Sequence, residues 1–217
     1  MIHPHTEIRF INDKIGYGVV ATKFIPKGTI TWAIDKLDRI FTGSQIKKMD
    51  PVYQNILDTY AYRNPEGNYI LCWDNARFVN HSSNSNCITT AYEFEIAVRD
   101  IQPGEELTDD YGYLNVDEPF EVVPEAGTDR TIIYPDDILR YYHIWDDKLW
   151  EAFQHLKTVS QPLESLLEKG TIEKARRIAS GMDKMDSILN CYYPRKNGSR
   201  KVFPELLVRS PNVVYPI

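Results

Sequence analysis

Two short segments of the chain hold residue types that could bind a ligand through backbone and polar side chains. Gly16 and Gly18 flank an aromatic residue between two strand-like stretches. Glycine lets the backbone approach a ligand more closely than a Cβ would allow, although the same pattern is also typical of a hairpin turn. Further along, Asn80, His81 and Ser82 follow an apolar pair and crowd hydrogen-bond donors and acceptors together. Such clusters form turns or hold polar ligands.

A third segment, residues 103–112, combines a tight turn and a short strand that ends at Tyr111. A buried tyrosine hydroxyl needs a hydrogen-bond partner, and it could equally be directed at a reacting group. The segment also carries four carboxylates, those of Glu105, Glu106, Asp109 and Asp110. Four acids suggest a metal site built from carboxylates. However, neighbouring residues of a strand point to opposite faces, so Glu105 and Glu106 would not share a face, and neither would Asp109 and Asp110. We therefore expect at least two of the four to be solvated charges.

The charge balance of the chain limits its partners. Lys and Arg number 25 against 31 Asp and Glu, which gives a net charge of −6. Because an acidic surface is repelled by phosphate backbones, direct nucleic-acid binding is not expected, whereas a lysine-rich peptide is a compatible partner. Residues 191–217 are locally basic. This indicates a solvated tail or, alternatively, a contact with a partner.

The cysteine content and the hydropathy of the chain allow expectations about its cellular location and about metal sites. The three cysteines are widely spaced without a Cys-x-x-Cys pair, which favours a reduced, intracellular protein without a cysteine-built zinc site. No second His or Cys stands at ligand spacing from His81, so we predict no metal centre. No apolar run reaches the ~20 residues of a membrane helix, and the N-terminus lacks a signal-like core. The default expectation is a cytoplasmic protein; a nuclear location or export without a cleaved signal stays open.

The elements that must position these segments are strands in the first half of the chain. Residues 29–34 are β-branched and apolar, and residues 92–98 alternate between apolar and mostly acidic side chains, as in a half-buried strand. Gly and Pro clusters separate the strands as turns. Residues 43–63 lack the alternation and are predicted to form short helices. This organisation indicates one β-rich domain over residues 1–113.

In the second half of the chain, the spacing of apolar residues changes from the alternation typical of strands to the three- or four-residue spacing typical of helices. Residues 114–134 are acidic and turn-rich and are predicted to be a connector, followed by a helical region with a basic tail over residues 135–217. Apolar residues recur every three or four positions over 138–156. Two more helices are expected at 162–169, ended by Gly170, and at 172–189, with Gly181 as a candidate break. The first helix carries an aromatic stripe of Tyr142, Trp145, Trp150 and Phe153. Its spacing favours packing against the first half over a binding site.

Taken together and in this order, the three segments resemble the SET-domain protein-lysine methyltransferases. That family has an early Gly-x-Gly turn, a central Arg-Phe-x-Asn-His-Ser segment and a final Gly-Glu-Glu-Leu-Thr-x-Asp-Tyr-Gly segment. The corresponding residues here are Gly16-Tyr17-Gly18, Arg77-Phe78-Val79-Asn80-His81-Ser82 and Gly104-Glu105-Glu106-Leu107-Thr108-Asp109-Asp110-Tyr111-Gly112. The resemblance covers roughly residues 5–113 and leaves the helical remainder unmatched.

The resemblance implies an α+β fold in which small sheets meet in a knot-like crossing, followed here by a helical C-terminal region. It implies that S-adenosylmethionine binds on one face while a lysine side chain enters a narrow channel from the other. The family's catalytic tyrosine corresponds to Tyr111. The family's cofactor contacts correspond to Gly16, Tyr17, Gly18, Arg77, Asn80 and His81.

Two departures from the family pattern concern the walls of that channel. Many members have cysteine where Ser83 stands, as part of a zinc-bound flank, and no cysteine cluster replaces it here. Tyr113 and the helices after residue 134 are therefore expected to cover the site. An aromatic residue that influences the number of methyl groups added is replaced by Asp109. The aromatic side of the lysine channel would then be supplied by Tyr60, Tyr62 or Tyr92. The alternative for each of them is an ordinary tyrosine of the core or the surface.

The favoured function is a methyltransferase that uses S-adenosylmethionine and acts on protein lysines, including histone-like basic tails. The alternative is a SET-like binding module without turnover that engages a protein partner through its helical half. A weaker third hypothesis is a metal enzyme that uses Asp109, Asp110 and Glu105 as ligands. The partner expected in the first case is a protein with an accessible lysine.

Overall fold

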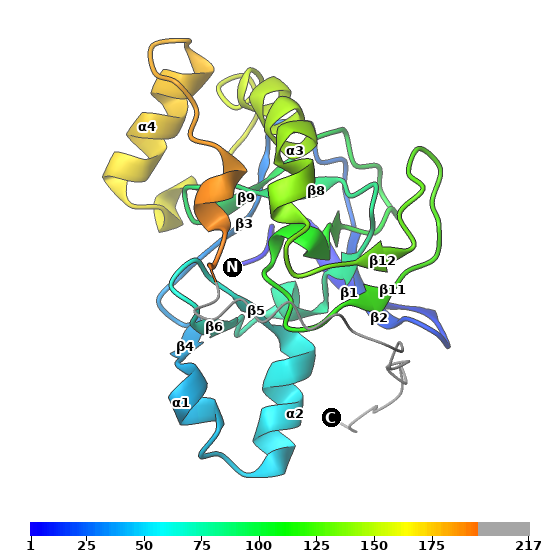
Figure 1. The fold of residues 1–217 in the computed structure, drawn as a ribbon. Helices are drawn as coiled ribbons and strands as arrows, with labels where there is room; N and C mark the ends of the chain where they lie inside the picture. Colours follow the sequence, from blue (N-terminus) through cyan, green and yellow to red (C-terminus); the bar gives the residue numbers. More distant parts are fainter. Residues whose placement is uncertain (195–217) are drawn as a thin grey trace.

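The computed structural model describes residues 1–194 as a mixed α/β fold with five small sheets (Figure 1). Most of the basic stretch 191–217, predicted as a tail, lies outside the described residues. The strands are β1 Thr6–Asn12, β2 Gly16–Ala21, β3 Ile30–Ala33, β4 Arg39–Phe41, β5 Ala61–Arg63, β6 Tyr69–Leu71, β7 Asn80–His81, β8 Cys87–Thr89, β9 Phe94–Ala97, β10 Thr108–Asp109, β11 Phe120–Glu121 and β12 Ile132–Ile133. The α-helices are α1 Gly43–Ile46, α2 Pro51–Tyr60, α3 Ile138–Phe153 and α4 Lys169–Ala179.

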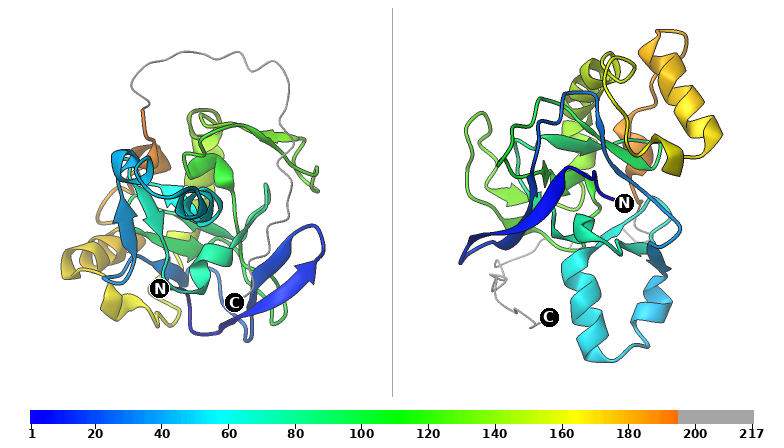
Figure 2. Two further views of the ribbon diagram at one scale, coloured as in Figure 1. Left: turned by 90° about the horizontal axis from the view of Figure 1, so that it is seen from below. Right: turned by 180° about the vertical axis from the view of Figure 1, so that it is seen from behind.

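The β1–β2 hairpin projects from the body of the molecule (Figure 2). Its far end is exposed, whereas Val19, Val20 and Ala21 at the end of β2 are buried in a core. The buried end of β2 also bonds the segment that follows residue 103, because the Leu107 amide donates to the Val19 carbonyl over 2.7 Å. The Gly-rich start of β2 is therefore held close to the later segments by apolar burial and backbone pairing.

The central sheet has the order β3-β9-β8, and all its pairs are antiparallel. The alternation predicted over residues 92–98 is present, since Phe94 and Ile96 are buried on one face. The other face of β9 is not solvated as the acidic residues suggested, because Glu95 is only partly exposed.

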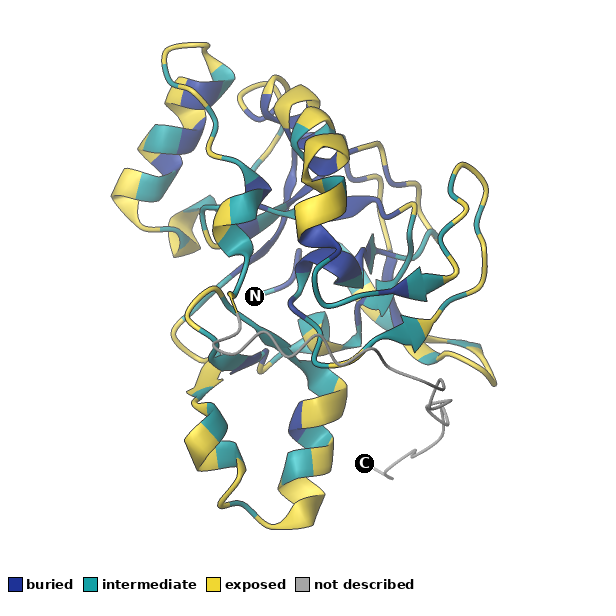
Figure 3. Cartoon of the chain, in the orientation of Figure 1, coloured by how far each residue is buried: buried dark blue, intermediate teal, exposed yellow. Residues whose placement is uncertain are grey.

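Residues 43–63 form the short helices that the sequence predicts. Thr42 caps α1 through a reciprocal capping box, and Pro51 occupies the first turn of α2, where its fixed φ suits helix entry. Both helices are mostly exposed and extend away from the sheets (Figure 3). They lead into the sheet β4-β6-β5.

The two chemistry-bearing segments of the first half lie side by side. β7 pairs in parallel with β10, with Asn80 opposite Thr108 and His81 opposite Asp109. The Ser82 amide extends the pairing by donating to the Asp109 carbonyl over 2.9 Å. This pairing is consistent with the SET fold, while the knot-like crossing itself stays a prediction.

Residues 114–134 are more than the connector that the sequence predicts. They include the two-stranded sheet of β11 and β12, in which Phe120 faces Ile133. The turn residues of this segment sit between the strands, so a hairpin forms where only a linker was expected. The boundary between a domain ending at 113 and a helical region starting at 135 stays a prediction.

Helix α3 packs on the central sheet through the predicted apolar stripe. Trp145 and Phe153 are buried with Phe94 of β9, whereas Tyr142 and Trp150 are on the exposed side. The aromatic stripe is therefore split between core and surface. One continuous core joins the central sheet to α3 and α4.

The predicted boundaries of the last two helices were wrong, whereas the candidate break at Gly181 is confirmed. Only a short 3₁₀ turn, Glu164–Leu166, occupies the predicted helix over 162–169. Gly170 lies in the first turn of α4 rather than ending a helix, because the buried face of Ile172, Ala175 and Ile178 determines where the helix forms. Helix α4 ends at Ala179, just before Gly181, whose φ is +69°. A positive φ is adopted readily by glycine, which explains the termination there.

Arg130 joins the segment 103–112 to the start of α3. Its guanidinium pairs with the buried carboxylates of Asp110 and Asp137, the latter over 2.8 Å, and stacks on Tyr141 with 4.6 Å to the ring centroid. Asp110 in turn accepts from the Gly112 amide over 2.9 Å, which caps the 3₁₀ turn Tyr111–Tyr113. The position of Tyr111 thus depends on a cation supplied by residue 130.

Replacing Arg130 with Met should destabilise the fold by about 3–5 kcal/mol, because the buried Asp110 carboxylate would lose its paired guanidinium and the buried Asp137 carboxylate the nearer of its two. Urea unfolding measures this change. Arg176→Met is the matched control, since the Arg176–Glu164 pair lies at the surface and should contribute about 0–1 kcal/mol. Equal effects of the two substitutions would contradict the role given to Arg130.

Candidate active site

Asn80 connects the glycine-rich strand to the segment 103–112. Its side-chain amide donates to the Tyr17 carbonyl over 3.0 Å and to the Glu106 carboxylate over 2.6 Å. Gly18 is buried between them, and a Cβ at this position would overlap the Glu106 carboxylate and lie 2.9 Å from Asn80 Nδ2. The absence of a side chain at residue 18 is therefore what allows the three segments to meet.

Gly16 has a different role from Gly18. Its φ is +82°, and no atom lies within 4 Å of the place a Cβ would occupy. The backbone at Gly16 thus borders open space rather than packed protein. Tyr17 between the glycines is exposed. This strand end could admit a ligand beside Asn80.

His81 and Tyr111 form the second contact between β7 and the Asp-Tyr segment. The Tyr111 amide donates to His81 Nδ1 over 3.1 Å, and the Tyr111 hydroxyl donates to the Val79 carbonyl over 2.7 Å. Burial lowers the pKa of His81, which favours a neutral ring whose Nδ1 accepts and whose Nε2 carries the proton. Burial and the nearby acids raise the pKa of Tyr111, so its hydroxyl stays protonated at neutral pH.

Phe120 covers this pair, and sequence reasoning did not identify it. Its ring centroid lies 5.8 Å from that of His81 and 6.2 Å from that of Tyr111. The same segment, residues 114–134, is anchored by Glu125, which accepts from the Ser82 hydroxyl over 2.6 Å. A lone aromatic in an acidic stretch gave no periodic signal in the sequence.

The Arg77 side chain forms no hydrogen bond or ring contact with Asn80, His81 or Tyr111; it lies at the surface. It is exposed on the 3₁₀ turn Asn75–Phe78, and its guanidinium donates to the Trp73 carbonyl over 2.9 Å. The predicted cofactor contact at Arg77 therefore has no support from the side-chain arrangement.

Two of the four acids keep contact with solvent, but the two others are fully enclosed, which strand alternation did not predict. Asp109 and Asp110 are buried, and Glu105 and Glu106 are partly buried. Glu105 pairs with Arg99, and Asp109 accepts from the Tyr113 hydroxyl over 2.9 Å. Sequence alternation missed this because both faces of the segment are covered by other parts of the chain.

The same contacts bear on the metal-enzyme hypothesis. Glu105, Asp109 and Asp110 bond three different partners and do not converge on a common point. Within residues 1–194, no group of three or more His, Cys, Asp or Glu side chains is arranged to hold a metal ion. The geometry therefore gives that hypothesis no support.

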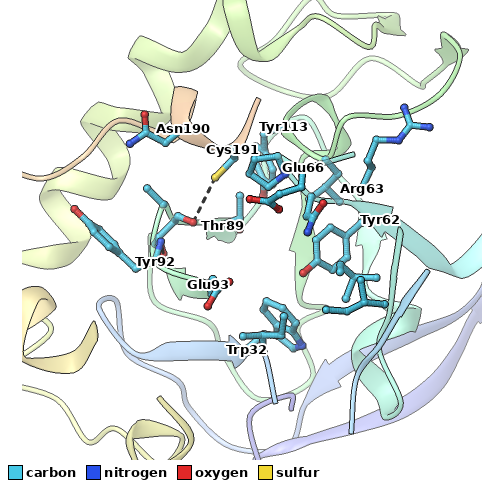
Figure 4. Close-up of a pocket in the computed structure, with 18 of the residues that line it drawn as sticks. Trp32, Tyr62, Arg63, Glu66, Thr89, Tyr92, Glu93, Tyr113, Asn190 and Cys191 are labelled. Carbon is cyan, nitrogen blue, oxygen red and sulfur yellow. Dashed lines mark hydrogen bonds between the residues drawn. The ribbon is translucent and has the colours of Figure 1, made fainter. Parts of the chain in front are cut away.

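A cavity of about 420 Å³ opens between the central sheet, the sheet β4-β6-β5 and the C-terminal segment (Figure 4). Tyr62 and Tyr113, two of the predicted channel residues, line it, as does Tyr92. Tyr60 does not line it and packs instead on Phe78, with 5.4 Å between ring centroids. Asp109 lies behind Tyr113 through their hydrogen bond.

The cavity also has residues that sequence reasoning did not identify. Trp32 packs edge-on against Tyr62 with 5.9 Å between ring centroids, and Glu66 and Glu93 supply carboxylates. Asn190 and Cys191 close one side, so the C-terminal segment does contribute to the wall. These residues come from loops and strands far apart in the chain, and no local pattern marks them.

Comparison with known proteins now identifies the domain. A family model described as SET domain matches residues 16–112. Residues 16–112 of this chain match a SET domain. A search of curated proteins finds no significant match. SET domains are usually lysine methyltransferases that use S-adenosylmethionine, and the SET domain here contains the meeting point of Gly18, Asn80 and Tyr111.

Gly18→Ala should destabilise the SET domain by about 1–3 kcal/mol, because the added methyl group would overlap the Glu106 carboxylate. Urea unfolding measures the loss. In the double variant Gly18→Ala/Glu106→Ala, most of the loss should be recovered, because the overlapping carboxylate is gone. An additive loss in the double variant would show that the close approach at Gly18 is not what matters.

Proposed function

We propose that this protein is a protein-lysine methyltransferase that uses S-adenosylmethionine. The observation that carries the proposal is the place of Tyr111. Its hydroxyl is held on the Val79 carbonyl, and its amide bonds His81, next to Asn80. Tyr113, two residues further along, lines the cavity. Tyr111 therefore stands between a candidate cofactor face and a candidate substrate cavity.

The residues at the cofactor face fit S-adenosylmethionine. The open backbone at Gly16 and the amide of Asn80 suit the polar amino-acid part of the cofactor, and the half-buried Glu106 carboxylate suits its ammonium group. The ring of Phe120, next to His81, suits contact with adenine. When bound, the cofactor supplies an electrophilic methyl group on a sulfonium.

The cavity fits a lysine side chain. Aromatic rings of Trp32, Tyr62 and Tyr113 suit its four methylene groups, and the carboxylates of Glu66 and Glu93 suit its charge. The amine has an ordinary pKa of about 10.4 and must lose its proton before it can attack. The positive sulfonium of the bound cofactor, close to the amine, disfavours the ammonium form and so assists this loss.

Tyr111 acts by orientation rather than as a base. Its proton is engaged with the Val79 carbonyl, and its raised pKa keeps the hydroxyl neutral. The oxygen can still accept a hydrogen bond from the amine and place it in line with the methyl group. Such alignment can lower a barrier by roughly 7–11 kcal/mol.

The substrate class we propose is a basic protein segment with an accessible lysine, such as a histone-like tail. The net charge of −6 and the two acids lining the cavity support this choice. None of the helices within residues 1–194 is long and apolar enough to cross a bilayer.

The test is methyl transfer from labelled S-adenosylmethionine to core histones and to a total protein extract. Wild-type protein should label protein bands, and Tyr111→Phe should reduce the label by 10²-fold or more through loss of alignment. Tyr53→Phe, an exposed tyrosine on α2, is the matched control and should keep full activity.

Undiminished label with Tyr111→Phe would overturn the role of Tyr111. Cofactor binding without label on any protein would instead favour the second function, a SET-like binding module. The observation behind that alternative is the buried Asp109, which stands where related enzymes carry an aromatic residue, together with the exposed Tyr142 and Trp150 on α3.

A further inference from the structure

One side of the cavity is formed by residues 187–193, which we call the wall segment (Figure 4). Asn190 and Cys191 of this segment line the cavity. The Cys191 thiol donates to the carbonyl of Thr90, another lining residue, over 3.4 Å. The wall segment comes long after residues 16–112 in the sequence, so contacts with that domain must hold it at the cavity.

Asn115 joins the wall segment to the domain. Its side-chain amide donates to the Cys191 carbonyl over 2.8 Å, and its side-chain oxygen accepts from the Tyr193 amide over 2.9 Å. The same amide also donates to the Arg63 carbonyl over 3.1 Å. The Asn115 side chain thus pairs with the wall segment as a neighbouring strand would, with a donor and an acceptor that meet residues two positions apart.

Asn115 is itself fixed by the turn that carries Tyr111. It is 4% exposed and does not line the cavity. It follows the 3₁₀ turn Tyr111–Tyr113, and its φ of +54° lies in the left-handed region, which asparagine adopts more readily than most residues. The Leu114 carbonyl before it accepts from the Arg63 amide over 3.3 Å. One short stretch of chain therefore positions both Tyr111 and the wall segment.

Two further contacts hold the ends of the wall segment. At its start, the Ser187 hydroxyl donates to the Asp146 carboxylate of α3 over 2.6 Å. At its end, the Tyr193 ring packs so closely on residue 67 that a Cβ at Gly67 would overlap it, and the Arg63 guanidinium lies 5.3 Å from the ring centroid. Loss of the Asn115 side chain would therefore release the part between these ends, where Cys191 lies, and leave the rest attached.

We propose that Asn115 is a positioning residue for methyl transfer, which holds the wall segment where it completes the lysine cavity. This inference rests on the proposed function and names what sets the shape of its substrate site. Without the three bonds of Asn115, the wall is in place for only a fraction of the time. A lysine side chain then has to order the wall in order to bind, which weakens its apparent affinity by that fraction.

The test variant is Asn115→Gly, because glycine adopts the φ of +54° without strain while every side-chain bond is lost. The KM for core histones should rise about tenfold, the effect of roughly one to two neutral hydrogen bonds. The kcat should stay within about twofold of the wild type, because the contacts of Tyr111 with Val79 and His81 are untouched.

The second readout is alkylation of Cys191 by iodoacetamide, followed by mass spectrometry, which needs no methyl transfer. Cys191 is partly exposed, whereas Cys72 and Cys87 are buried. In Asn115→Gly, alkylation of Cys191 should accelerate about tenfold while the two others stay protected, because only the wall segment opens. Acceleration at all three cysteines would reveal general unfolding and would overturn the local role of Asn115.

Gln161→Ala is the matched control. The Gln161 side chain also makes three hydrogen bonds to backbone groups, with Ile30, Gly28 and Leu156, over 2.8, 2.8 and 2.9 Å. It is half-buried like a typical anchoring amide, and it does not line the cavity. The control loses as many bonds without releasing the wall segment, so its KM and its Cys191 alkylation should match the wild type. Equal changes in both variants would overturn the proposal.

If Asn115→Gly does not fold, Asn115→Asp decides. It keeps the acceptor for the Tyr193 amide and loses both donors, so KM and Cys191 alkylation should rise in the same direction by a smaller factor. Wild-type values of both quantities in this variant would contradict the proposal.

The failure of this inference is distinguishable from the failure of the proposed function. If core histones are labelled but neither KM nor Cys191 alkylation changes in Asn115→Gly, the methyltransferase stands and the positioning role is removed. If the wild type labels no protein, the proposed function fails. Selective alkylation of Cys191 in Asn115→Gly would then still show that Asn115 holds the wall segment, and unchanged alkylation would remove that role as well.

Discussion

Two consecutive buried carboxylates, Asp109 and Asp110, impose the main constraint on this structure. Burying charge is costly unless a counter-charge or a proton accompanies it, and the two residues meet this demand in different ways. Asp110 pairs with Arg130, which ties residues 114–134 and the start of α3 to the SET domain. Asp109 accepts from the Tyr113 hydroxyl, and burial raises the pKa of its carboxyl to about 6. Because Tyr111 follows directly, both arrangements determine where its hydroxyl lies.

The resulting site has two faces that meet at Tyr111. On one face the glycine at residue 18, the Asn80 amide and Glu106 are in contact, which leaves an open polar strand end. On the other face, aromatic rings surround a cavity with acidic groups. The proposed methyl transfer needs this separation of cofactor and lysine, since only the reacting atoms should meet. The hairpin of β11 and β12 brings Phe120 over His81 and Tyr111.

The contiguous motifs could be predicted from sequence because their function depends on a few adjacent residues. Gly16–Gly18, Asn80–His81 and Tyr111 are brought together as the SET resemblance implied, whereas Arg77 is not. The partial burial of Glu95 could not be predicted, because strand alternation placed it on a solvated face. Arg130 and Phe120 lacked any local pattern. The helix boundary at Gly170 was missed because packing of the α4 apolar face outweighs the propensity of a single glycine.

The most direct test of the central claim is calorimetric titration of S-adenosylmethionine into the wild type, Asn80→Ala and, as a control, Asn84→Ala, an exposed neighbour. The account predicts one site in the wild type, unchanged affinity for Asn84→Ala, and a loss for Asn80→Ala of about 1–3 kcal/mol, roughly 5- to 150-fold in Kd. No heat of binding in the folded wild type, or equal affinity for folded Asn80→Ala, would contradict it.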